Sequence, residues 1–107
     1  MKNDQFYIDQ ILDAIRKIES YAEGIGKNEF LSDEKTQSAI LLQLLLIGEI
    51  SKKISENTRA KYDLPWKMII GFRDRAIHNY FEMDIRVVWD TIQQDVPLLK
   101  KTLGKQK

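Results

Sequence analysis

The feature of this sequence that most constrains its fold is the segment 39–47, AILLQLLLI, in which every residue except Gln43 is apolar. The segment lies within a longer helical pattern, which can begin with Ser32 or Asp33 as its cap and runs to about Asn57. A helix that is apolar nearly all round must be covered on more than one side. Three other helices of so small a chain are not expected to cover it fully. We therefore favour a homodimer that buries the second face, with a central helix of a monomeric bundle as the alternative.

Three further segments carry apolar residues at three- and four-residue spacing, and no segment alternates with the period of two typical of strands. The first of these helices is expected to begin at Asn3 or Asp4 and to end at the Gly-Ile-Gly of residues 24–26. A short loop should then run through Asn28. The apolar stripe of this helix consists of Ile8, Ile11, Leu12, Ile15, Ile18 and Ala22.

Proline and aspartate mark the two remaining helices. Pro65 suits a first helical position, because its missing N–H would be unpaired there, and Asp84 can cap the last helix after a connection over residues 79–83. Pro97 should kink or restart that helix. The faces expected to be buried are Trp66, Ile69, Ile70 and Ile77, and then Ile85, Val88, Trp89, Ile92 and Val96. The sequence thus predicts an all-α fold, an antiparallel bundle of four main helices in one domain over residues 1–107.

Composition excludes several kinds of chemistry. The chain has no cysteine, which removes disulfides, thiolate nucleophiles and cysteine-ligated zinc, and one histidine makes a poor transition-metal site. We therefore expect neither a metal nor another cofactor. No signal peptide is apparent, and the longest apolar run is much shorter than a membrane span of about 20 residues. These features predict a soluble, cytoplasmic protein without a membrane partner.

The formal net charge is +1, so any contact with nucleic acid must come from local arginines or from an assembly. The lysines near the end of the chain have two interpretations. We favour a solvated helix end stabilised by the helix dipole, and contact with nucleic acid is the alternative. These lysines are Lys100, Lys101, Lys105 and Lys107.

The segment 71–81, GFRDRAIHNYF, holds the only histidine of the chain, together with two arginines, an aspartate and a tyrosine. Cleavage of RNA without a metal needs a base for the 2′-hydroxyl proton, a cation for the phosphate and an acid for the leaving oxygen. The imidazole of His78 can move protons near neutral pH. The guanidinium of Arg73 stays charged and matches phosphate oxygens with two parallel donors. The segment is therefore a candidate catalytic site.

Helical geometry limits how these groups can meet. Residues five apart on a regular helix, such as Arg73 and His78, point about 140° away from each other, whereas Asp74 and His78 lie within about 40°. Asp74 can therefore orient His78. Across a two-fold axis, each Arg73 could approach the histidine of the other subunit. The spacing favours a composite site at a dimer interface.

Arg73, His78 and Tyr80 form the pattern R-x4-H-x-Y, which resembles the signature of the HepT-like HEPN domains, small helical proteins of prokaryotic toxin–antitoxin systems. The resemblance extends over most of the chain. It includes Asp74, directly after the arginine, and Gly48-Glu49 on the preceding helix. Pro65-Trp66 upstream and Tyr80-Phe81 followed by Asp84 complete it.

The resemblance implies a metal-independent endoribonuclease toxin of a type VII-like HEPN/MNT system, acting as a homodimer on RNA, with tRNA as a candidate substrate. Arg73 and His78 would be catalytic, with Asp74 and Glu49 as supporting residues. The partner would be an MNT-type nucleotidyltransferase antitoxin that inactivates the toxin by adding AMP to Tyr80. The products would be a 2′,3′-cyclic phosphate and a 5′-hydroxyl.

Structural interpretations of the same residues stay open. His78 can end a helix and donate to a carbonyl, and Arg73 and Arg75 can pair with acids. Tyr80 can be a rim aromatic, and Glu49 can be structural or line the cleft. An alternative function on the same scaffold is a non-catalytic HEPN module that binds and regulates a nucleotidyltransferase or a nucleotide.

Overall fold

A computed structural model describes residues 3–104 of the chain, and these residues form helices without any strand. The four main helical segments are α1 (Asp4–Ala22), α3 (Glu34–Lys53), α5 (Trp66–His78) and the run α6 (Ile85–Asp90), η2 (Thr91–Asp95) and α7 (Val96–Gly104). The short elements between them are α2 (Lys27–Leu31), α4 (Glu56–Arg59) and η1 (Tyr80–Glu82). The predicted all-α bundle is confirmed.

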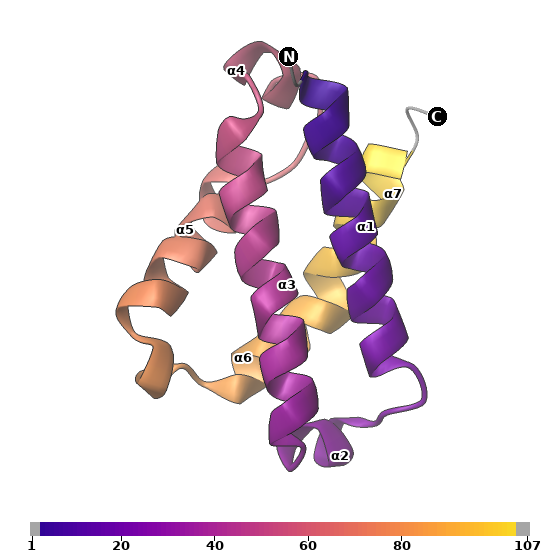
Figure 1. Ribbon diagram of the computed structural model, residues 1–107, viewed down its shortest axis with the longest axis vertical. Coiled ribbons are helices and arrows are strands. Elements are labelled where there is room, and N and C mark those ends of the chain that lie inside the picture. Colours follow the sequence, from indigo (N-terminus) through magenta and orange to yellow (C-terminus); the bar gives the residue numbers. More distant parts are fainter. Residues whose placement is uncertain (1–2, 105–107) are drawn as a thin grey trace.

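Helix α3 occupies the centre of the bundle, with α1 on one side and α5 on the other (Figure 1). Successive long helices run in opposite directions, and the α6–η2–α7 segment crosses behind them. The core lies between these layers and draws on every long helix. Its fully buried members include Ile8, Ile11, Ile15, Ile18, Phe30, Ile40, Ile47, Val88, Val96 and Leu103.

Helix α3 begins as expected and ends earlier than expected. The carboxylate of Asp33 accepts hydrogen bonds from the Thr36 N–H at 3.1 Å and from the Thr36 hydroxyl at 2.6 Å, which confirms Asp33 as the cap. The helix ends at Lys53 and does not run to Asn57. Ser55 caps α4 instead, and it is bound by the Asp4 carboxylate at the start of α1. This tertiary contact ends the helical pattern.

The prediction of a loop through Asn28 is wrong, because residues Lys27–Leu31 form the short helix α2. Gly24 provides the expected exit from α1, with a φ of 74° that a residue without Cβ adopts readily. Helix α2 places Phe30 in the core, where the centroid of its ring lies 5.3 Å from the ring centroid of Trp89. Burial of this ring fixes the segment as a helix.

The buried face of α5 differs in part from the expected one. Trp66 and Ile69 pack against the core, but Ile77 is half exposed and Ala76 is buried in its place. Pro65 was expected to be the first helical residue, but it is the N-cap, and α5 begins one residue later at Trp66. The difference arises because α5 packs mainly on α3, so only the stripe that meets α3 is covered.

The last helix follows the sequence closely. The Asp84 carboxylate accepts the Arg86 N–H at 2.9 Å, which confirms the cap, and Val88, Ile92 and Val96 are buried as expected. The predicted irregularity at Pro97 takes the form of the wider π-helical turn η2, immediately before it. Such a turn accommodates a proline, which cannot donate to the residue four positions earlier. Lys105 and Lys107 of the basic tail lie outside the described residues.

The apolar middle of α3 is only partly covered. Ile40, Leu44 and Ile47 are buried, whereas Leu42 is 54% exposed and Leu46 is also exposed on the outer face. Part of the apolar surface that motivated the expected homodimer is therefore accessible in one chain. None of the helices over residues 3–104 is long and apolar enough to cross a membrane.

Candidate active site

The candidate site is built where α3 and α5 approach each other closely, at Gly48. A Cβ added to Gly48 would lie 2.5 Å from the Cβ of Arg73 and 3.2 Å from the carbonyl oxygen of Ile69. Glycine, which has no Cβ, permits this approach. The contact places Arg73 of α5 beside Glu49, the next residue of α3.

Arg73 is held by two carboxylates. Its Nη1 donates to Asp74 Oδ1 at 2.9 Å, and its Nε lies 3.1 Å from Glu49 Oε1. The second contact is an ion pair whose angle falls outside hydrogen-bond geometry, which leaves the buried Glu49 oxygen without a hydrogen bond in the described part of the chain. A guanidinium has five N–H donors, so Arg73 keeps donors for a further anion.

Asp74 is committed to Arg73 rather than to His78. The hydrogen bond from Arg73 is the main cause that lowers the pKa of Asp74 below its ordinary value, and the charges of Lys52, Arg73 and His78 add to it. No hydrogen bond joins Asp74 to His78 over residues 3–104. The expected orienting contact is therefore not formed here, although the charge of His78 contributes to the lowered pKa of Asp74.

His78 is the last residue of α5 and is exposed. The helix continues through His78, so Arg73 and His78 point about 140° apart and are separated by about 7.5 Å along the axis. Tyr80 follows on η1, and its side chain is 45% exposed. One chain therefore brings Glu49, Asp74 and Arg73 together and leaves His78 and Tyr80 at the helix end.

Lys52 is a site residue that our interpretation of the sequence missed. It lies on α3, three residues after Glu49, and its charge acts on the Asp74 carboxylate. Lys52 lies three residues after Glu49 and four after Gly48, and residues at these spacings share one face of a helix. This spacing was the signal in the sequence. Lys52 adds a cation at the edge of the Arg73 cluster.

Oxygen and nitrogen ligands for a metal do not gather in the described residues, where no group of three His, Asp or Glu side chains lies together. The groups that do gather are a guanidinium, an ammonium, two carboxylates and, at the helix end, an imidazole. A guanidinium can bind a phosphate, and an imidazole can transfer protons.

The bundle and the spacing of Arg73, His78 and Tyr80 are those of a HEPN-like domain. The family model described as "Ribonuclease HepT-like" matches residues 11–105, and the chain belongs to this HepT-like ribonuclease family. No solved structure matches the chain.

Curated relatives agree with the family. "Probable ribonuclease HepT" of Thermococcus cleftensis is 40% identical over 100 residues, which cover 92% of this chain and 91% of the relative. A protein of Caldanaerobacter subterraneus subsp. tengcongensis, named as a candidate RNase, is 34% identical over 102 residues, 94% of this chain and 91% of its own length. A candidate RNase of Methanocaldococcus jannaschii is 32% identical over 96 residues, 89% of this chain and 88% of its own.

The close contact at Gly48 gives a first prediction. Gly48→Ala should lower the free energy of unfolding by about 1–3 kcal/mol, because the new Cβ overlaps Arg73 and the α5 backbone, and it should displace Arg73. Gly71→Ala is the matched control on α5, since its Cβ meets only the flexible end of Arg75 at 3.2 Å. Urea denaturation of both variants checks the difference. Equal stability of Gly48→Ala and the wild type would contradict the assigned role of Gly48.

Proposed function

We propose that this protein is a metal-independent endoribonuclease in which Arg73 and His78 are the catalytic residues. The observation that carries the proposal is the arrangement of Arg73, whose guanidinium is anchored by Glu49 and Asp74 and still has unused donors. Anchoring on two sides orients the guanidinium before a phosphate arrives, and preorganised charge is the main source of electrostatic catalysis. The exposed His78 supplies a group that moves protons.

The reaction is a transesterification. His78 takes the proton from the ribose 2′-hydroxyl, whose oxygen attacks the adjacent phosphorus. The P–O5′ bond breaks, and the 5′-oxygen takes up a proton, which gives a 2′,3′-cyclic phosphate and a 5′-hydroxyl. Arg73 stabilises the negative charge that builds up on the phosphate oxygens. Glu49 and Asp74 act as supporting residues by positioning Arg73.

The active unit is proposed to be a homodimer with composite sites. Arg73 and His78 diverge on one helix, and the outer face of α3 leaves Leu42 and Leu46 exposed. A two-fold axis near this face would bury the leucines and bring each Arg73 towards the histidine of the second copy.

The biological setting is proposed to be a type VII-like toxin–antitoxin system in the cytoplasm. The substrate is RNA, with tRNA as a candidate, and the partner is an MNT-type nucleotidyltransferase antitoxin. The acceptor of AMP is Tyr80, whose side chain is 45% exposed and whose hydroxyl makes no hydrogen bond within residues 3–104. Access to this hydroxyl is the physical requirement for the transfer.

Cleavage assays test the catalytic assignment. Total tRNA should be cut in the presence of EDTA, and His78→Ala and Arg73→Ala should each lose about a hundred- to ten-thousand-fold in rate, as expected for removal of a positioned acid–base or phosphate-binding group. Arg16→Ala, which removes an exposed arginine of α1, is the control of equal charge and should cut normally. Circular dichroism should show that all three variants fold.

Loss of cleavage in EDTA, or His78→Ala activity near that of the wild type, would exclude the proposed mechanism. A wild-type protein that binds a nucleotidyltransferase but cuts no RNA would favour the non-catalytic regulatory module.

Mixing experiments test the composite site. Arg73→Ala and His78→Ala are each inactive alone, but a dimer of one with the other holds one site with an intact arginine and an intact histidine. Co-refolded mixtures should therefore regain activity, up to about a quarter of the wild-type value for random pairing of two-site dimers. Sedimentation of the wild type at tens of micromolar should show a dimer. A mixture as inactive as its components would place both residues in one subunit.

Incubation with the antitoxin and ATP tests Tyr80. Mass spectrometry should find one AMP on Tyr80, and cleavage should stop, because the added phosphodiester and purine repel and displace the RNA backbone. Tyr80→Phe should keep most RNase activity and resist inactivation. An adduct on another residue, or none with an active cognate enzyme, would remove Tyr80 from the mechanism.

A further inference from the structure

The side chain of Phe81 has no packing role in the fold. Its exposure is 98%, whereas Phe30 is fully buried and Trp66 and Trp89 pack against the core. A phenyl group left in water forfeits the roughly 1.5–3 kcal/mol that burial would provide. Phe81 directly follows Tyr80 and lies three residues after His78, at the end of α5. The exposed ring therefore lies close in the chain to the proposed catalytic residue His78.

The backbone that carries this exposed ring forms a hydrogen-bonded turn. Residues Tyr80–Glu82 form the turn η1, closed by hydrogen bonds from the Glu82 N–H to the Asn79 carbonyl at 3.0 Å and from the Met83 N–H to the Tyr80 carbonyl at 3.4 Å. The rings of Tyr80 and Phe81 meet edge to face, with centroids 5.4 Å apart and an interplanar angle of 88°. The Phe81 ring thus contacts the Tyr80 ring and is otherwise open to solvent.

A hollow of about 450 Å³ lies between η1 and the first half of α3. One wall is apolar and aromatic, and the other carries hydrogen-bonding side chains of α3. The Nε2 of Gln37 donates to the Phe30 carbonyl at 2.8 Å, which leaves its Oε1 to accept. The lining is Glu34, Gln37, Ser38, Leu41, Tyr80, Phe81, Met83 and Ile85. A flat aromatic surface beside a row of polar groups suits a ligand with an apolar face and a polar edge.

We propose that this hollow is a nucleobase subsite of the active site, in which an unpaired base of the RNA substrate stacks on Phe81. The proposal rests on the proposed RNase function and specifies its substrate class, single-stranded segments. Consecutive Cα atoms are 3.8 Å apart, so Phe81 lies within about 11 Å of His78. A base belonging to a nucleotide at or beside the cleaved bond can therefore reach it. Bases of a duplex are stacked on one another and cannot.

A second protein chain fits this surface less well. Apolar interface cores are depleted in glutamate and serine, and both Glu34 and Ser38 line the hollow together with Phe81. The same groups suit a base, since carboxylate and amide oxygens accept from the amino groups on base edges. RNA is therefore the occupant that the hollow favours.

The ring itself can be tested with a labelled single strand containing 2′-deoxyribose, which lacks the attacking hydroxyl and stays intact. Fluorescence anisotropy should show Phe81→Ala and Phe81→Leu binding about 5- to 150-fold more weakly than the wild type, because stacking on an aromatic ring is lost. Phe81→Trp should bind as well as the wild type. Leu98→Ala, which removes an exposed apolar side chain of α7 that does not line the hollow, is the control and should bind normally.

A strand whose bases are replaced by abasic sites should bind all these variants equally weakly, and pairing the strand into a duplex should have the same effect. Three results would overturn the subsite. Phe81→Ala could bind the strand as tightly as the wild type, Phe81→Leu could bind it as tightly as Phe81→Trp, or the wild type could fail to bind it. Sedimentation of Phe81→Ala should show the same assembly as the wild type, and a shift to smaller species would assign the ring to a protein interface. Base-dependent binding by a wild type that cuts no RNA would overturn the RNase function and leave the subsite intact.

Discussion

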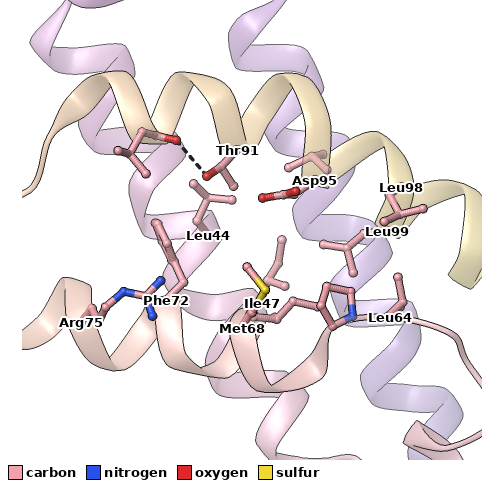
Figure 2. Close-up of a pocket in the computed structure, with 14 residues that line it drawn as sticks. Leu44, Ile47, Leu64, Met68, Phe72, Arg75, Thr91, Asp95, Leu98 and Leu99 are labelled. Carbon is pink, nitrogen blue, oxygen red and sulfur yellow. Dashed lines mark hydrogen bonds between the residues drawn. The ribbon is translucent and has the colours of Figure 1, made fainter.

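The close contact of α3 with α5 at Gly48 is the constraint on which the candidate site depends. Helix α5 packs mainly on α3, and a cleft lies between α5 and the α6–η2–α7 segment (Figure 2). Leu44 and Ile47 of α3 line that cleft, and Met68 and Phe72 of α5 face it. The position of Arg73 therefore follows from a single helix–helix contact, and a side chain at Gly48 would change the spacing of the site directly.

Charge balance within the site explains how a chain of net charge +1 can act on a polyanion. Arg73 and Lys52 are opposed by Glu49 and Asp74, so the cluster has no large excess of positive charge. Such a site gains little from long-range attraction, since non-specific affinity for nucleic acid rises with the number of phosphates neutralised. Binding must then come from oriented donors, from a second copy of the chain and from contacts to the bases.

The sequence predicted most of the fold because its signals are local. Caps such as Asp33 and Asp84 act on N–H groups two or three residues away, and a π-helical turn before Pro97 follows from its missing N–H. The errors concern contacts between distant residues. Helix α3 ends early because Asp4, far away in the sequence, binds Ser55, and α2 forms where Phe30 meets the ring of Trp89. Neither contact leaves a periodic signal.

For the site, the residue types and their spacing along α5 could be predicted from the sequence. The R-x4-H-x-Y pattern fixed the divergence of Arg73 and His78, because a helix imposes about 100° per residue. What the sequence did not predict is that Glu49 and Lys52 of α3 lie close enough to act on Arg73 and Asp74 of α5. These contacts join side chains of two helices that are far apart in the sequence. They form because α3 packs closely against α5 at Gly48, which no local spacing records.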